Sequence, residues 1–127
     1  MEVPRLLLID DEPEIGSFLR TVAEGCGFQV TVTSAPEAFK SAYESVQPNV
    51  IALDLAIPGT DGIELLSFLA ERGCRAKILI LSGFDREILD AAQRLGEARG
   101  LDIAGVVAKP ARPAQLRNLL RELRTAA

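Results

Sequence analysis

The clearest pattern along the chain is an alternation of short apolar runs with longer amphipathic segments. Four of the short runs are continuously apolar, and they cover residues 6–9, 50–53, 78–81 and 106–108. Continuous apolar runs of strand length are typical of strands covered on both faces, as in a parallel sheet. A fifth run, Phe28–Val32, alternates apolar and polar residues and predicts an edge strand with one wetter face.

Helical patterns fill the segments between these runs. Apolar residues at three- and four-residue spacing predict helices over residues 15–26, 38–46, 63–72, 85–99 and 116–123. Pro13 can open the first helix, and Ser34–Glu37 has the pattern of a capping box before the second. Glycines that suit a left-handed C-cap follow three helices, at Gly27, Gly73 and Gly100. Strand and helix therefore alternate five times, which predicts one doubly wound α/β domain over residues 1–127.

Composition narrows the functions that such a domain can have. The 127 residues include no histidine, which excludes histidine-based acid–base catalysis, histidine-assisted nucleophiles and histidine zinc sites. The net charge is −4 and tryptophan is absent, so we expect no direct contact with nucleic acid. Cys26 and Cys74 form no CxxC pair and are predicted to be unpaired thiols in a reducing cytoplasm. We expect neither a signal peptide nor a membrane-spanning segment, and we predict a cytoplasmic protein.

Polar residues directly follow four of the predicted strands. In chain order they are Asp10, Asp11, Glu12, Asp54, Ser82 and Lys109. Because ligands bind at the carboxyl ends of the strands in an open α/β sheet, we expect these side chains to converge. Clustered carboxylates repel one another unless a cation relieves them, and oxygen ligands suit Mg²⁺. A lysine beside them would neutralise phosphoryl oxygens, so the pattern predicts a Mg²⁺-assisted phosphoryl site with an aspartate as nucleophile. The alternative for residues 10–12 alone is capping of the first helix.

At these residues the sequence resembles the receiver domain of bacterial two-component response regulators, over essentially the whole chain. The matching segments are residues 8–13 (LIDDEP), 54–62 (DLAIPGTDG), 81–83 (LSG) and 109–110 (KP). The resemblance implies a flavodoxin-like (βα)5 domain whose parallel sheet has the strand order 2-1-3-4-5. It also implies a cis peptide between Lys109 and Pro110.

The resemblance further implies a role for each residue of the site. Asp54 would accept a phosphoryl group from the phosphohistidine of a partner histidine kinase or phosphotransfer protein, or from a small phosphodonor. Lys109 would bind the phosphoryl oxygens, and Ser82 would hydrogen-bond the phosphoryl group and thereby shift the loop after the fourth strand. The implied Mg²⁺ ligands are Asp10, acting largely through water, Asp11, Asp54 and the backbone carbonyl of Ala56.

A receiver of this kind would not be an enzyme for other substrates, because its chemistry is gaining and losing its own phosphoryl group. The chain has no histidine to donate, so it would be the accepting partner. The implied partners are a kinase or phosphotransfer protein and an output domain or target, controlled through the last strand and the last two helices. Arg117, Arg121 and Arg124 fall on one side of the last helix, which is either a solvated face or part of a partner or homodimer surface.

Two features depart from the family pattern. Val106 occupies the position, three before Lys109, where the family usually has an aromatic residue that turns inward on activation. The stretch between Ser82 and Lys109 is more than one helical turn longer than usual, so the fourth helix and its exit loop, residues 93–101, are expected to be extended. This length is similar to that of receivers attached to EAL-type cyclic-di-GMP phosphodiesterase domains.

Two functions from other classes stay open beside the phosphorylated switch. The first is a receiver-like interaction module that acts without phosphorylation, which Val106 motivates. The second is a small stand-alone Mg²⁺-dependent phosphohydrolase, although we find no lid or specificity element in the sequence.

Overall fold

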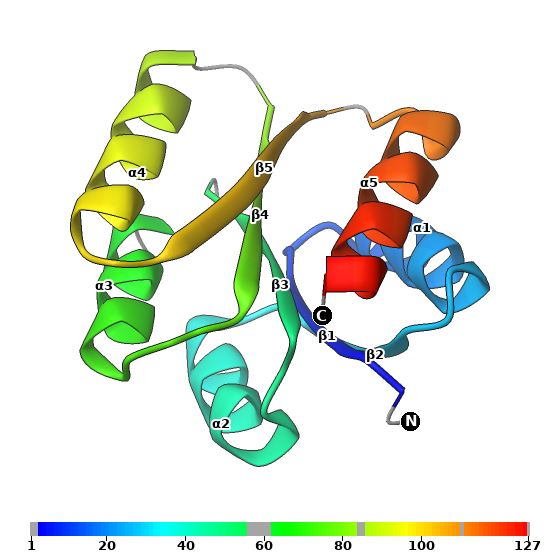
Figure 1. Cartoon of the computed structure of the whole chain (residues 1–127), viewed down its shortest axis with the longest axis horizontal. Helices are drawn as coiled ribbons and strands as arrows, with labels where there is room; N and C mark the ends of the chain where they lie inside the picture. The colour runs from blue at the N-terminus through cyan, green and yellow to red at the C-terminus, as the bar shows by residue number, and fades with distance from the viewer. Residues whose placement is uncertain (1–2, 56–61, 84–85, 110, 127) are drawn as a thin grey trace.

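The computed structural model of the chain describes residues 3–55, 62–83, 86–109 and 111–126. The elements are β1 (Arg5–Ile9), α1 (Pro13–Gly25), β2 (Gln29–Thr33), α2 (Pro36–Val46), β3 (Val50–Asp54), α3 (Gly62–Glu71), β4 (Lys77–Ser82), α4 (Arg86–Ala98), β5 (Asp102–Ala108) and α5 (Pro113–Ala126). The predicted alternation of strand and helix is therefore confirmed. Figure 1 shows the twisted sheet at the centre, with helices on both sides of it.

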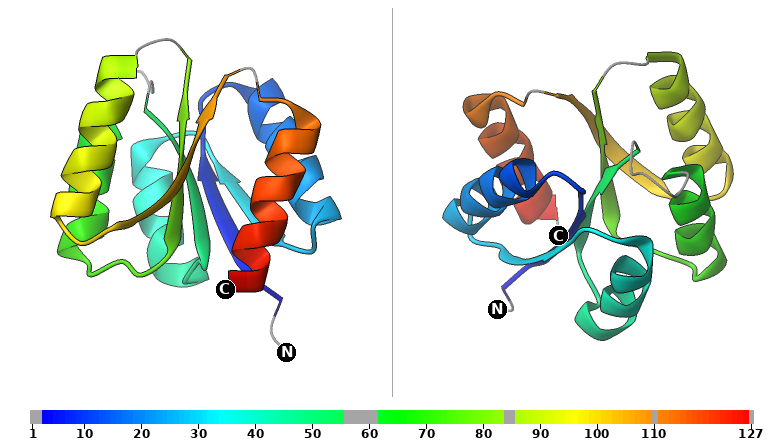
Figure 2. Two further views of the ribbon diagram at one scale, coloured as in Figure 1. Left: turned by 45° about the horizontal axis from the view of Figure 1, so that its top comes forward. Right: turned by 180° about the vertical axis from the view of Figure 1, so that it is seen from behind.

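All five strands are parallel and lie in the order β2-β1-β3-β4-β5, as expected. The strand β2 lies at one edge of the sheet, which confirms the prediction from its alternating pattern. Helices α1 and α5 cover one face, and α2, α3 and α4 cover the other (Figure 2). Within the described residues, no helix combines the length and the apolar character that crossing a bilayer requires.

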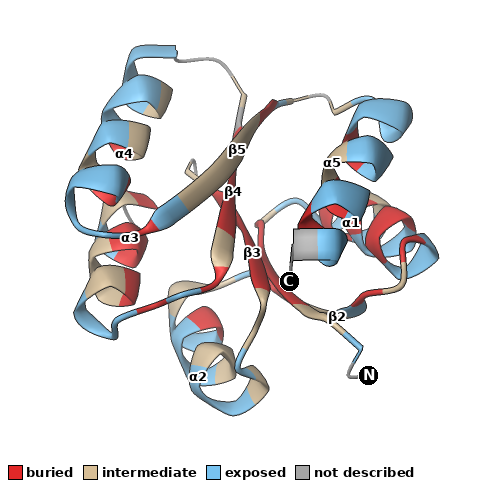
Figure 3. Cartoon of the chain, in the orientation of Figure 1, coloured by how far each residue is buried: buried red, intermediate tan, exposed pale blue. Residues whose placement is uncertain are grey.

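The continuous apolar runs supply both faces of the sheet. In β1, Leu6 and Leu8 point into the core layer beneath α1 and α5, whereas Leu7 and Ile9 point into the layer beneath α2, α3 and α4. Alternation along a strand sends successive side chains to opposite faces, so a strand buried on both faces has to be apolar throughout. Figure 3 shows the result, with buried strands at the centre and exposed outer helix faces.

The fifth strand differs from the prediction of a strand covered on both faces. It begins at Asp102, forms the second edge of the sheet, and of residues 106–108 only Val107 is fully buried. Its pairing with β4 shifts between Ile78 and Leu79, so that Ala104 is an extra residue, as in a β-bulge. Helix α4 has 13 residues, the same length as α1. Of residues 93–101, the first six complete α4 and the last three connect it to β5, and their extension relative to other receivers stays a prediction.

The predicted capping box at the start of α2 is wrong. Ala35 is the N-cap residue, and no side chain caps the helix there. The reason is Pro36, which takes the first helical position and forces the preceding residue into an extended conformation (φ −133°, ψ 149°). With Ala35 at the N-cap, Ser34 stands outside the helix, and Glu37 takes the second helical position where a capping box needs the acidic residue at the third. The glycine C-caps are confirmed, since Gly27, Gly73 and Gly100 all have positive φ.

Gly62 links the packing of the fold to the end of β3. It is buried as the first residue of α3, and a Cβ atom on it would stand 2.8 Å from the backbone Cα of Leu55, the residue after Asp54. A backbone atom cannot rotate away as a side chain can. A methyl group at position 62 would therefore push directly on the end of the strand that carries Asp54.

We expect Gly62→Ala to lower the free energy of unfolding by about 1–3 kcal/mol, the usual cost of overpacking a core. The measurement is chemical denaturation followed by circular dichroism. The matched control is Gly25→Ala at the end of α1, where a new Cβ meets nothing within 4 Å. Equal stability of the two variants would show that helix α3 can move away from Leu55 at no cost.

Candidate functional site

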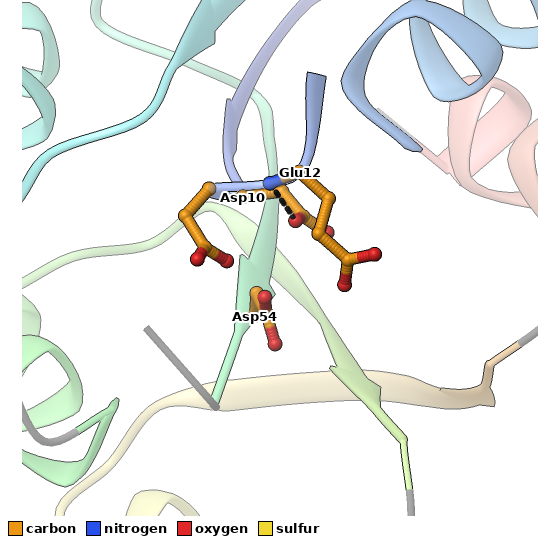
Figure 4. A group of neighbouring side chains, drawn as sticks. Asp10, Glu12 and Asp54 are labelled. Atoms are coloured by element: carbon orange, nitrogen blue, oxygen red, sulfur yellow. Dashed lines mark hydrogen bonds between the residues drawn. The ribbon is translucent and has the colours of Figure 1, made fainter. Parts of the chain in front are cut away.

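The candidate site lies where the carboxyl ends of β1, β3 and β5 meet. Asp10 directly follows β1, Asp54 is the last residue of the fully buried strand β3, and Lys109 directly follows β5. Parallel pairing aligns these ends, with Ile9 beside Leu53 and Asp54 beside Leu81. Figure 4 shows the carboxylates of Asp10, Glu12 and Asp54 gathered at this edge.

Local hydrogen bonds hold the end of β1 in place. The Asp10 backbone N–H donates to the Thr33 carbonyl at 3.1 Å, and the Thr33 hydroxyl donates to the Leu8 carbonyl at 2.8 Å. The Glu12 backbone N–H donates to Asp10 Oδ1 at 2.9 Å, which forms the turn into α1 (Figure 4). Glu12 is the N-cap residue of α1, and no side chain makes a cap hydrogen bond there, so the capping bond that the alternative for residues 10–12 predicts is not made. The other oxygen of Asp10, Oδ2, faces Lys109.

A single ammonium group contacts three carboxylates. Lys109 Nζ lies 2.9 Å from Asp10 Oδ2, 3.0 Å from Asp54 Oδ2 and 3.3 Å from Glu12 Oε1. Asp10 and Asp54 are only 2% and 1% exposed, whereas the Glu12 side chain is largely in solvent. The two aspartate contacts are therefore buried ion pairs, in which each charge depends on its partner for compensation.

Burial and the contacts between opposite charges shift the pKa values of this site in opposite directions. Burial raises the pKa of Asp10, and the nearby charge of Asp54 adds to that effect, while Lys109 and the Glu12 N–H oppose it. For Lys109, burial alone would lower the pKa. The contacts with Asp10 and Asp54 outweigh burial, so the pKa of the lysine is raised and the ammonium form is favoured.

The carboxylates also form a cluster that suits a hard cation. Asp10, Asp11, Glu12 and Asp54 each offer an oxygen, and these oxygens lie within 4.8 Å of one another. Asp10 Oδ2 is buried and, among the described residues, accepts no hydrogen bond of normal geometry, although it is in charge contact with Lys109. A buried anionic oxygen with spare coordination, in an all-oxygen donor set, fits Mg²⁺.

The structure thus brings together four of the predicted site residues, Asp10, Asp11, Asp54 and Lys109. The backbone of Ser82 ends β4 beside Ala108, in the position expected for it. Ala56, whose carbonyl was predicted as a metal ligand, and Pro110 of the expected cis peptide lie outside the described residues.

Two further residues belong to the site and were not predicted to have these roles. Glu12 contacts Lys109, and only its place in the acidic run after β1 pointed to the site. Thr33 ends the edge strand β2, whose end is not among the four predicted to converge, yet its carbonyl and hydroxyl hold the end of β1 in place. No sequence pattern marks a threonine of this kind.

Val106 lies on β5 in the place of the family's usual aromatic residue. It is half-buried, pairs with Ile80 of β4, and packs against the core layer beneath α2, α3 and α4. Its branched side chain is short, so an inward swing of a ring cannot occur at this position.

The protein is thus a doubly wound α/β domain with buried aspartates and a lysine at the carboxyl ends of its strands. The model of the response regulator receiver domain matches residues 6–121. The chain therefore belongs to the receiver domain family of response regulators, the signalling proteins of two-component systems.

Individual relatives agree with this assignment. The chain is 28% identical over 120 residues to the positive alginate biosynthesis regulatory protein of Pseudomonas aeruginosa. The aligned region is 92% of this chain and 46% of that protein. The chain is 30% identical over 123 residues to protein-glutamate methylesterase/protein-glutamine glutaminase 2 of Burkholderia thailandensis. Here the aligned region is 94% of this chain and 34% of that protein. The chain thus spans less than half the length of these curated relatives.

A solved structure has the same fold over the full length. The crystal structure of a response regulator from Colwellia psychrerythraea superposes with a TM-score of 0.85 at 28% identity, covering 99% of this chain and 100% of the other. The strand order 2-1-3-4-5 and the five helices are common features of the family's flavodoxin-like fold.

The buried ion pairs generate a prediction about stability and pH. We expect Lys109→Met to lower the free energy of unfolding by about 3–5 kcal/mol at pH 7, because Asp10 and Asp54 would stay buried without their cation. In the wild type, the pKa of Lys109 is higher in the folded state than in the unfolded chain, where it is about 10.4. The stabilisation by the ion pairs is therefore fully present below about pH 10.4, and it is lost as the pH rises through the pKa of the folded state.

Without the ammonium, the pKa of Asp10 would rise further above its unfolded value. The folded variant would then bind more protons than the unfolded one, so its deficit should grow as the pH rises from about 4 to 7. Urea denaturation across this range measures the deficit. The control is Lys77→Met, which removes an exposed ion pair with Asp102 and should cost less than about 1 kcal/mol. A Lys109→Met deficit that is independent of pH would contradict the ion-pair explanation.

Proposed function

We propose that Asp54 accepts a phosphoryl group from a phosphohistidine of a partner protein and that this chain is thereby a switch in two-component signalling. The observation that carries the proposal is the position of the Asp54 carboxylate. It is 1% exposed at the end of β3, with Lys109 Nζ 3.0 Å from Oδ2 and a further acidic pair from β1 beside it.

The chain's own residues would act as follows. An Asp54 oxygen attacks the phosphorus, the bond between phosphorus and the donor's nitrogen breaks, and the donor histidine leaves with that electron pair. Lys109, which already contacts Asp54, would move its charge contact to the phosphoryl oxygens and stabilise their negative charge. Ser82, at the end of the neighbouring strand β4, would donate a hydrogen bond to the phosphoryl group once it is in place.

Mg²⁺ is the proposed cofactor. Asp10, Asp11 and Asp54 would hold it, with the Ala56 carbonyl as a further ligand. Bound there, Mg²⁺ would neutralise charge on the transferring phosphoryl group. The spare coordination of Asp10 Oδ2 supports this assignment, since the oxygen is buried and, among the described residues, accepts no hydrogen bond of normal geometry.

The proposed partners follow from the same role. They are a histidine kinase or phosphotransfer protein as donor, and an output domain or target that reads the face formed by α4, β5 and α5, in the cytoplasm. Arg117, Arg121 and Arg124 are all exposed on α5 and could be used by such a partner or by a second copy of the chain. Beyond acceptance and hydrolysis of its own phosphoryl group, we propose no enzymatic activity for this chain, and attachment to an EAL domain stays a prediction.

The first test is phosphorylation by acetyl phosphate with Mg²⁺, followed by intact-protein mass spectrometry. We expect one acid-labile phosphate on the wild type and none on Asp54→Asn. The control is Asp90→Asn, which removes an exposed aspartate of α4 and should leave the adduct unchanged. An adduct on Asp54→Asn would place the acceptor elsewhere. A wild type without any adduct would sink the proposal and favour an interaction module that acts without phosphate.

The second test concerns the metal and needs no phosphodonor. A ligand at tenfold excess over its dissociation constant stabilises the folded state by about 1.4 kcal/mol, which is a rise of several degrees in Tm for a domain of this size. We therefore expect Mg²⁺ to raise the Tm of the wild type and to leave that of Asp11→Asn nearly unchanged. Glu14→Gln, an exposed acidic residue in the first turn of α1, is the control and should keep the full shift. Equal shifts in all three proteins would mean that Mg²⁺ binds elsewhere.

A further inference from the structure

A cavity lies at the amino ends of β3 and β4, at the opposite end of the strands from the phosphorylation site. The two are separated by about 16 Å, the length of a five-residue strand. The cavity is lined by the end of α2, the segment before β3, the segment between α3 and β4, and the start of β4, and its volume is about 440 Å³. This volume is within the usual range for small-molecule sites. The residues of the phosphorylation site do not contribute to it, because they stand at the carboxyl ends of the same strands.

The charge of this cavity differs from that of the protein as a whole. Arg72, Arg75 and Lys77 line it together with one carboxylate, Glu44, although the chain has a net charge of −4. Arg72 is paired with Glu44, and Lys77 Nζ lies 3.0 Å from Asp102 Oδ2. Arg75 makes no ion pair or hydrogen bond with the residues that the structure describes, and its side chain is exposed. The cavity thus has a surplus of positive charge that an anion would compensate.

Aromatic contacts position part of this charge in advance. The Arg72 guanidinium stands 4.7 Å from the centre of the Phe68 ring, and Lys40 Nζ stands 5.5 Å from it. Tyr43 packs edge-on against the same ring at 5.8 Å. A guanidinium held on a ring loses less freedom when it binds a phosphate, and its planar fork suits two phosphate oxygens.

The rest of the lining suits a neutral organic part. Tyr43 and Pro48 provide apolar surface. The Tyr43 phenol is neutral at pH 7, as an ordinary tyrosine is, and therefore does not repel an anion. Asn49 Oδ1 accepts a hydrogen bond from the Arg5 backbone N–H, which orients the Asn49 side chain.

We propose that this cavity binds a small organic polyphosphate, of the nucleoside diphosphate kind, with Arg72, Arg75 and Lys77 on its phosphates and Tyr43 and Pro48 against its organic part. A concave site of this volume favours a small molecule over an extended nucleic acid or peptide. Binding here does not need the phosphorylation chemistry, so the two proposals can fail separately.

The Glu44–Arg72 pair allows a test in which a substitution should strengthen binding. Glu44 competes with any phosphate for the Arg72 guanidinium and also repels the anion. Glu44→Gln should therefore strengthen binding, by about tenfold if it releases one charge-assisted hydrogen bond. Glu37→Gln makes the same change of charge in the exposed first turn of the same helix, and should change the affinity little.

Loss of affinity is tested with arginine. Arg75→Gln should weaken binding by about tenfold for the loss of one charge-assisted contact. Arg94→Gln, an exposed arginine on α4 away from the cavity, is the control for the same change in net charge.

The experiment is isothermal titration of the whole chain with ADP, and separately with pyrophosphate, in EDTA so that no metal bridges the ligand to the aspartate site. It is carried out on the wild type and on Asp54→Asn, with sodium sulfate as a comparison anion. We expect one site per chain, equal affinity in wild type and Asp54→Asn, tighter binding in Glu44→Gln and weaker binding in Arg75→Gln.

Three results would overturn the proposal. One is no saturable binding of either probe at millimolar concentration. Another is equal weakening in Arg75→Gln and Arg94→Gln, which would indicate attraction to net charge only. The third is a single-stranded oligonucleotide that binds tightly while ADP does not, which would make this face a macromolecular surface instead.

Discussion

The contact of one ammonium group with two buried carboxylates is the interaction on which the functional edge of this molecule depends. Asp10 and Asp54 are almost fully removed from water, and neither charge would be stable there alone. Lys109 compensates both from the end of β5, across the intervening strand β4. Because the compensation is shared, any new negative charge on Asp54, or any cation near Asp10, changes the balance for all three groups. This sensitivity is the physical basis of the switch that we propose.

The two-sided burial of the sheet decides where polar chemistry can occur. With helices covering both faces, the central strands β1 and β3 are filled almost entirely by apolar side chains, so charged groups collect where the strands begin and end. The carboxyl edge holds the acidic cluster with its single lysine, and the amino edge holds the cavity with a surplus of cations. The chain has a modest net negative charge, but its two sheet edges have opposite character.

Much of the fold and of the site could be predicted from the sequence, and the failures have local causes. Continuous apolar runs and glycine C-caps depend on neighbours in the chain, so strands, helices and their order were predictable. The capping box failed because Pro36 determines the conformation of Ala35 more strongly than Ser34 can. The last strand was predicted too short because its first half, at an edge, lacks the apolar pattern of a covered strand. Thr33 was missed because its role depends on the position of β1, which no local pattern records.

The strand–helix alternation, the apolar faces and the residue types at the strand ends can all be read from the amino-acid sequence, because they follow from periodicity and chain order. The contacts of Lys109 with Asp10, Glu12 and Asp54 depend on the packing of the whole chain, since Glu12, for example, is 97 positions away from Lys109 in the sequence. The same packing also forms the basic cavity between α2, the segment after α3, and β4. Distances and burial between remote segments result from the packing of whole elements, and it is burial that turns ordinary charged residues into strongly coupled ones.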